Sequence, residues 1–154
     1  MNTPSTRPAV GLPSPRALLL ALEHFIPYQQ ADVMRSTLKG RELDDVIRSF
    51  HASVLATPVT HGQEGKGDDA IVGLHYFTGS ADWYITERDV GDTPLDGGLD
   101  YQAQAFGLCC ISDPELGYVS IADLLPHPSV NVDLYWTPKT VRECRAEWLK
   151  KMGR

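Results

Sequence analysis

The sequence lacks an apolar run that could cross a membrane. Its longest such run, Ala17 to Leu22, is far shorter than the roughly 20 residues that a bilayer requires. Pro8, Pro13 and Pro15 interrupt the N-terminus, and no small-residue cleavage site follows Leu22, so a signal peptide is not indicated. We therefore expect a protein that stays in the cytoplasm and contacts no membrane.

Cysteine is scarce. The chain contains three cysteines, Cys109, Cys110 and Cys144, and none of them forms a C-x-x-C pair. Cys109 and Cys110 are neighbours in sequence, and neighbouring residues of a strand point to opposite faces of the sheet. A disulfide framework or a structural zinc site is therefore not expected, and we interpret the cysteines as small apolar side chains of the core.

Positive charge is nearly absent from the middle of the chain. Residues 82–136 contain one Lys or Arg and ten Asp or Glu, whereas residues 137–154 contain six Lys or Arg and two Asp or Glu. The net charge of the whole chain is −6. An acidic segment repels nucleic acid and favours a basic partner surface, so we expect no direct nucleic-acid binding. The alternative is that these acidic residues only keep the protein in solution.

Recognisable catalytic motifs are also missing. The glycine-rich stretch that ends in Lys66 has Gly67 where a phosphate-binding loop needs Ser or Thr, and no serine lies in a G-x-S-x-G elbow. A histidine with carboxylates could still hold a divalent cation or activate a water molecule, and such a set would be His75, Asp82, Glu87 and Glu115. The alternative is a partly buried His75 held by one hydrogen bond. We assign no catalytic residue, metal ligand or cofactor.

The chain has the composition of an ordinary globular domain. It has 154 residues, of which 42% are hydrophobic and 22% charged, and one compact core is the expected arrangement at this length. Residues 1–13 are rich in Pro, Ser and Thr and are predicted to form a flexible arm. Residues 14–154 are predicted to form a single domain.

Helical periodicity is confined to the first part of that domain and to its end. Within the helical part, residues 14–60, Ser14 and Pro15 predict the start of a first helix, residues 28–38 are compatible with a second, and the apolar spacing from Leu43 to Val54 predicts a third. A closing helix is predicted over 140–152, where Thr140 and Glu143 have capping-box spacing.

The β-rich part, residues 70–136, follows an exposed glycine-rich connection at 61–69. Turn residues separate five short apolar or aromatic segments, which predict strands at 70–77, 82–88, 102–111, 118–121 and 130–136. Strands joined by tight turns form antiparallel sheets. We therefore predict an α+β fold, with an antiparallel β-meander of about five strands packed against N-terminal helices and one C-terminal helix.

Aromatic side chains are concentrated in the β-rich part. Trp83-Tyr84 and Tyr135-Trp136 are adjacent pairs, so one member of each must face away from the other. An exposed aromatic residue surrounded by acidic residues is typical of a protein-binding hot spot. The alternative is that these rings pack at an edge beneath the N-terminal arm.

Several motifs of the β-rich part follow one another in a recognisable order. They are His75-Tyr76-Phe77-Thr78-Gly79, Asp82-Trp83-Tyr84-Ile85-Thr86-Glu87, Ala105-Phe106-Gly107, Glu115-Leu116-Gly117-Tyr118-Val119-Ser120-Ile121 and Val132-Asp133-Leu134-Tyr135-Trp136. Over residues 60 to 140 the sequence resembles a family of uncharacterised domains encoded on plasmids, phages and integrated mobile elements. The resemblance implies an accessory protein of a mobile element.

Small acidic proteins of that genetic setting are often inhibitors of host defence. The resemblance therefore implies a non-enzymatic anti-CRISPR protein that acts in the bacterial cytoplasm on a type I surveillance complex, blocking DNA binding or nuclease recruitment. An antirestriction protein and a metal-dependent hydrolase of plasmid maintenance are the alternatives, and a homodimer is left open. The residues expected to contact the partner are Asp82, Trp83, Glu87, Asp89, Asp92, Asp96, Asp100, Asp113 and Glu115.

Overall fold

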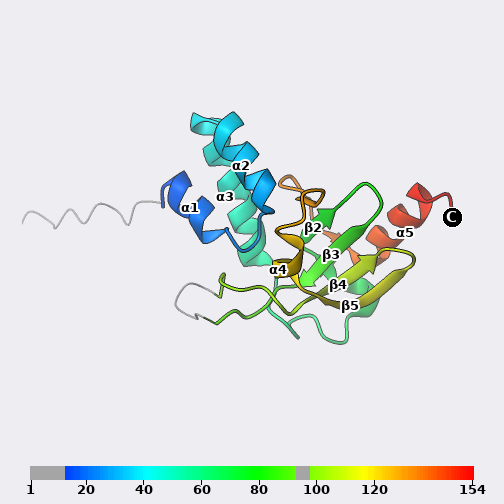
Figure 1. The fold of residues 1–154 in the computed structure, drawn as a ribbon. Helices are drawn as coiled ribbons and strands as arrows, with labels where there is room; N and C mark the ends of the chain where they lie inside the picture. Colours follow the sequence, from blue (N-terminus) through cyan, green and yellow to red (C-terminus); the bar gives the residue numbers. More distant parts are fainter. Residues whose placement is uncertain (1–12, 93–97) are drawn as a thin grey trace, which may run out of the picture.

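The computed structural model describes residues 13–92 and 98–154, and it shows an α+β fold (Figure 1). Three helices come first, then the strands, and a helix closes the chain. The helices are α1 (Pro15–Ala21), α2 (Tyr28–Thr37), α3 (Gly40–Ala56), α4 (Ile121–Leu124) and α5 (Val141–Lys151). The strands are β1 (Ile71–Val72), β2 (Leu74–Phe77), β3 (Asp82–Glu87), β4 (Ala105–Cys110), β5 (Pro114–Val119), β6 (Asn131–Val132) and β7 (Lys139–Thr140).

The main sheet has five strands in the order β5-β4-β3-β2-β6, and every neighbouring pair is antiparallel. The predicted antiparallel sheet is therefore confirmed: β2 to β5 form a meander, and β6 joins it beside β2. A separate two-stranded sheet joins β1 to β7. Because β5 ends the order, one of its two edges has no strand beside it among the described residues.

Two of the predicted strands have different limits in the structure. The strand predicted over 70–77 is divided at Gly73 into β1 and β2, because the chain there passes so close to Thr57 that a Cβ on Gly73 would lie 2.3 Å from its Oγ1. The strand predicted over 130–136 is only two residues long, because Asp133 starts a turn in which its carboxylate accepts the backbone N–H of Tyr135.

The remaining strand limits also shift. The strand predicted from residue 102 begins at Ala105, since Gln102 is buried and bonds the preceding loop instead of a strand. The strand predicted over 118–121 begins earlier, at Pro114, and ends at Val119, because the Ser120 side chain accepts the N–H of Asp123 and starts α4. In each strand a side chain that bonds the backbone, Gln102 or Ser120, accounts for one of the two limits.

Helices cover both faces of the main sheet. One core contains apolar side chains of α1, α2 and α3 packed on residues such as Leu74, Tyr76 and Ile85. The second core lies under α5, where Trp148 packs with Tyr84 and Leu108. In Figure 1 the N-terminal helices accordingly lie on one side of the sheet and α5 lies on the other.

The predicted helix starts are confirmed. The Ser14 side chain accepts the N–H of Ala17 at the start of α1, and Pro15 is its first residue. Thr140 and Glu143 form the expected capping box at α5. Residues 28–37, which the sequence left ambiguous, form the helix α2. Within the described part of the chain, no helix is both long and apolar enough to cross a membrane.

Candidate binding site at the edge of the sheet

An irregularity in β3 brings the side chains of Glu87, Phe106 and Tyr118 into one row across the sheet. Tyr84 pairs with Leu108 and Ile85 with Gly107, but the next pair joins Glu87 to Phe106, so Thr86 is an extra residue. A bulge of this kind moves the residues after it to the other face of the strand. Glu87 therefore lies beside Phe106, on the face where Phe106 in turn pairs with Tyr118 of β5.

The Glu87 carboxylate holds the glycine-rich connection against this row. Its Oε1 accepts the backbone N–H of His61 at 2.9 Å, and its Oε2 accepts that of Gln63 at 2.8 Å. Glu87 is only 5% exposed, and no Lys or Arg of the described chain forms an ion pair with it. The carboxylate is thus buried and bonded to amides without a neutralising cation.

Gln63 fixes the same segment from the inside. Its side-chain amide donates to the carbonyls of Ile71 and Thr86, and its Oε1 accepts the N–H of Ile71. His61 has a positive φ of 74°, a conformation that residues other than glycine adopt rarely. The segment from residue 61 to residue 67 therefore has a defined shape, which Glu87 and Gln63 impose.

A partly open cavity of about 380 Å³ lies between this segment and the sheet. The sheet contributes Glu87, Phe106, Leu116 and Tyr118 to its lining, and the 61–67 segment contributes His61, Gln63, Glu64, Gly65 and Gly67. The rings of Phe106 and Tyr118 meet edge to face with their centroids 5.4 Å apart. We call this space the edge cavity.

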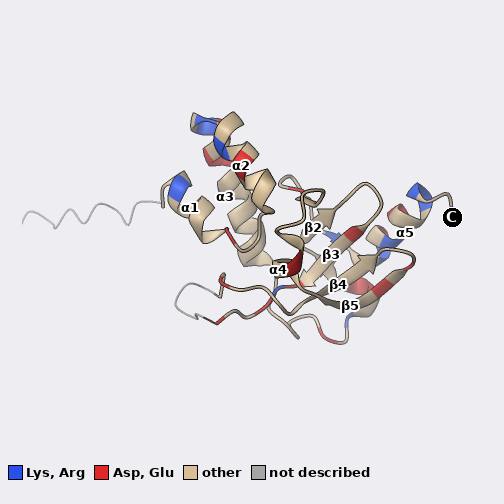
Figure 2. Ribbon diagram, viewed as in Figure 1, with Lys and Arg blue, Asp and Glu red and all other residues tan. Residues whose placement is uncertain are grey.

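The outer strand beside the edge cavity carries exposed side chains. Glu115, Leu116 and Tyr118 of β5 are exposed, and Tyr118 retains 64% of its surface. Since β5 pairs only with β4 among the strands of residues 13–92 and 98–154, its outward backbone N–H and C=O groups can accept a further strand. Figure 2 shows one acidic position on the ribbon of β5, whereas basic positions gather on α5.

Two of the predicted partner-contact residues are buried. Asp82 is 3% and Glu87 is 5% exposed, so neither can belong to the exposed acidic surface that the sequence led us to expect. Asp82 is drawn inward by His75, and Glu87 by the amides of the 61–63 segment. Trp83 is half-buried and packs against the core beneath the N-terminal helices.

The acidic loop after β3 is largely a structural element. The Asp89 carboxylate accepts the N–H groups of Gly91, Ala103 and Gln104, and Asp100 accepts that of Asp92. Asp92 itself is exposed, and Asp96 lies outside the described residues.

The acidic residues around the start of β5 are the exposed ones. Asp113 is exposed and pairs with Arg154 at 2.8 Å. Glu115 is exposed on the strand itself. Of the predicted partner-contact residues, Glu115 is therefore the one that lies on the free edge strand.

The histidine and carboxylates considered for an enzyme are not gathered at one point. His75 Nε2 lies 2.7 Å from Asp82 Oδ1, and the His75 ring stacks on Tyr84 with centroids 4.6 Å apart. Glu87 lies at the other end of β3, and Glu115 lies on the exposed edge. Across residues 13–92 and 98–154, no three His, Cys, Asp or Glu side chains are grouped so that they could hold a metal ion.

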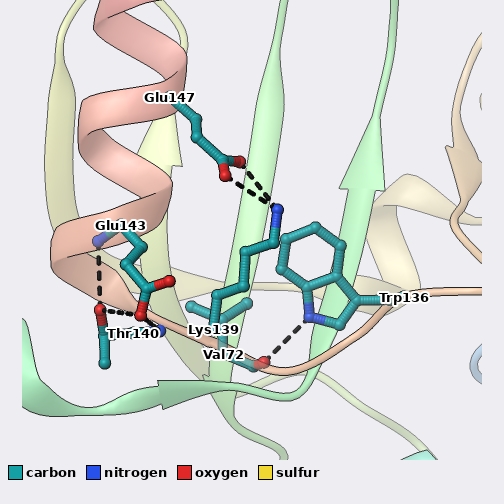
Figure 3. Close-up of polar contacts among 6 residues, drawn as sticks. All are labelled: Val72, Trp136, Lys139, Thr140, Glu143 and Glu147. Carbon is teal, nitrogen blue, oxygen red and sulfur yellow. Dashed lines mark hydrogen bonds and ion pairs between the residues drawn. The ribbon is translucent and has the colours of Figure 1, made fainter.

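The second aromatic pair divides into one exposed and one half-buried ring, although it lies in the turn after β6 and not in a strand. Tyr135 is exposed, and Trp136 is half-buried with its ring N–H donating to the Val72 carbonyl at 2.9 Å. The Lys139 ammonium lies 5.2 Å from the Trp136 ring centroid and bonds both oxygens of Glu147 (Figure 3). These contacts fasten the chain before α5 onto the sheet.

The buried cysteines have the environment that the sequence indicated. Cys110 and Cys144 are fully buried in the core under α5, and Cys109 is half-buried on the other face. Burial raises the pKa of Cys110 and of Cys144 to about 12. Both thiols therefore stay protonated and unreactive at neutral pH.

Sequence reasoning missed the polar side chains that shape the site. Gln63 and Gln102 are both buried, and Gln102 alone bonds the backbone of Asp89, Gly98 and Asp100. Nothing in the spacing of these residues indicates such bonds. The one available signal was the position of Gln63 among glycines, in a segment without apolar residues.

Comparison with known proteins identified no relative. No family model matches the chain, and neither a curated protein nor a solved structure is significantly similar to it.

Proposed function

We propose that this protein acts by binding another protein through the free edge of β5 and the edge cavity beside it, without catalysing a reaction. The observation that carries the proposal is the combination of an unpaired edge strand with exposed Leu116 and Tyr118 next to a shaped cavity. Peptides commonly bind by adding a strand to such an edge, with backbone hydrogen bonds for affinity and neighbouring pockets for side chains.

The charge of this region favours a basic partner. Glu115 lies on β5, and Glu64 and Glu87 line the edge cavity. Exposed carboxylates such as those of Glu64 and Glu115 steer a positively charged partner toward an interface and disfavour nucleic acid. A lysine- and arginine-rich protein surface meets these requirements.

The resemblance found in the sequence supports one class of partner. A crRNA-guided type I surveillance complex presents basic channels built for phosphate, and an acidic inhibitor docking there would compete with DNA. We propose this anti-defence role as the first to be tested. A restriction enzyme, which also has a basic DNA-binding surface, is the alternative target.

The proposal is tested by affinity capture with matched variants. Tagged protein is incubated with lysates that contain type I surveillance complexes and restriction enzymes, and the captured proteins are identified by mass spectrometry. Tyr118→Ala and Leu116→Asp alter the proposed surface, whereas Tyr135→Ala alters an exposed ring elsewhere. We expect a partner that the first two variants lose and the third retains.

The captured complex is then assayed for DNA binding. Loss of DNA binding would indicate that the protein occupies the DNA channel, and retained DNA binding without cleavage would indicate blocked nuclease recruitment. Capture that is identical for all three variants would contradict docking through β5.

A further inference from the structure

We infer that the edge cavity receives the guanidinium group of an arginine side chain from the partner. This inference rests on the proposed function and names the group that the same surface recognises. It follows from three properties of the cavity: its unneutralised carboxylate, its aromatic wall and its size.

The carboxylate is the first property. Glu87 lines the cavity, and only 5% of its surface is exposed. Its two oxygens each accept one backbone N–H, and a carboxylate oxygen can accept a second donor. Burying a charged group costs free energy unless the charge is paired. Folding has already removed the Glu87 carboxylate from water, so a cation that enters the cavity would pair with it without a further cost of desolvating the carboxylate.

A second carboxylate stands at the entrance. Glu64 also lines the cavity and is largely exposed, with its Oε2 3.8 Å from His61 Nδ1. Among the described residues, His61 is the only titratable nitrogen in the cavity lining. No Lys or Arg contributes to that lining, so the cavity contains two carboxylates and no permanent cation.

The aromatic wall is the second property. Phe106 and Tyr118 stand side by side in the row that begins with Glu87, so the rings and the carboxylate lie on the same face of the sheet. Cations bind over the faces of aromatic rings. A planar, weakly hydrated guanidinium can stack on a ring while its N–H groups bond a carboxylate, which a compact ammonium does less well.

The size of the cavity is the third property. About 380 Å³ is ample for one long side chain, and it lies near the lower end of the range of about 300 to 1,000 Å³ for pockets that bind drug-sized ligands. The cavity opens beside β5, so a strand added to that edge could place one side chain into it. Strand addition uses backbone bonds for affinity and side-chain pockets for specificity.

The inference is tested on the isolated protein, without any partner. The probe is N-acetyl-L-arginine methylamide, titrated into isotope-labelled protein and followed by amide chemical shifts. The reference probe is N-acetyl-L-leucine methylamide, which has the same backbone and no charge. We expect saturable shifts at His61, Gln63, Phe106 and Tyr118 with the arginine probe and none with the leucine probe.

Variants separate the cavity from general surface charge. Tyr118→Ala removes a ring of the wall and is expected to weaken binding of the arginine probe about two- to fivefold, the range for an exposed cation–π contact. Glu64→Gln is expected to weaken it about two- to threefold, as for an exposed ion pair. Both residues are exposed, so neither change should unfold the protein, and Tyr135→Ala is expected to bind as the unaltered protein does.

Each outcome decides the inference. Saturable, arginine-selective shifts that Tyr118→Ala weakens support it. Shifts that are absent, equal for both probes, or located away from the edge cavity overturn it. If capture of a partner depends on β5 while the arginine probe does not bind, the arginine inference fails and the proposed function stands. If the probe binds and no partner is captured, the proposed function fails.

Discussion

Gly107 of β4 and Gly117 of β5 face each other across the sheet, and a side chain fits at only one of them. A Cβ on Gly107 would lie 2.0 Å from the carbonyl oxygen of Tyr84, whereas a Cβ on Gly117 would have no neighbouring atom within 4 Å. The sheet is thus closed tightly at β4 and open at its outer strand.

The glycine pair gives the first prediction. Gly107→Ala forces a methyl group against backbone and is expected to lower the free energy of unfolding by about 2–3 kcal/mol. Gly117→Ala adds the same group in open space and is expected to change it by less than about 0.5 kcal/mol. Urea unfolding of both variants measures the difference. Equal effects would show that β4 is not packed as described.

Glu87 gives the second prediction. Glu87→Ala leaves the N–H groups of His61 and Gln63 without their acceptor, and bonds to a charged group contribute about 1.5–3 kcal/mol each. We expect faster hydrogen exchange at these two amides and a loss of about 3 kcal/mol in stability. Glu64→Ala, in the same segment but exposed, is the control and should change neither. Unchanged exchange in Glu87→Ala would contradict the assigned role.

The acidic loop gives the third prediction, because its two kinds of carboxylate should respond differently to substitution. Asp89→Ala removes the acceptor of three backbone N–H groups and is expected to destabilise the protein by about 2–4 kcal/mol. Asp92→Lys changes an exposed residue and is expected to alter stability by less than about 0.5 kcal/mol. Thermal unfolding compares them. A stable Asp89→Ala variant would show that the loop does not depend on this carboxylate.

The buried thiols give the fourth prediction. Burial raises the pKa of Cys110 and Cys144 from 9.0 to about 12. Between pH 9 and pH 12 the thiols of the unfolded chain lose protons that the folded protein keeps. Their contribution to the free energy of unfolding is therefore complete below pH 9 and is lost as the pH rises. Urea unfolding at pH 8, 9 and 10 should show falling stability, with a smaller slope for Cys144→Ala. Stability that is flat or rises over this range would contradict the burial of the thiols.

The sequence predicted the fold well wherever a local pattern was sufficient. Ser14 followed by Pro15 marked the start of one helix, and Thr140 with Glu143 marked the start of another. Capping involves only residues within the first turn of a helix, so a short stretch of sequence indicates it. The antiparallel run from β2 to β5 followed from the turn residues between apolar segments, whereas the pairing of β6 with β2 was not predicted. Strand limits were less accurate, because side chains such as Asp133 and Ser120 bond the backbone and end a strand early.

The candidate site was less predictable, because its geometry depends on contacts between distant parts of the chain. The bulge at Thr86 reverses the face of Glu87, and a regular alternation of residues cannot indicate it. Glu87 accepts hydrogen bonds from the backbone N–H groups of His61 and Gln63, which lie 26 and 24 residues earlier in the sequence. The acidic composition of residues 82–136 likewise could not distinguish exposed Glu115 from buried Asp82.

Hydrogen exchange of the protein alone and in complex with its captured partner tests the central proposal most directly. The proposal predicts slower exchange on binding in β5, residues 114–119, and in the 61–67 segment, because a partner strand would satisfy the outward backbone groups and cover the edge cavity. Protection confined to the N-terminal helices or to α5, with exchange in β5 unchanged, would contradict binding through the edge of the sheet.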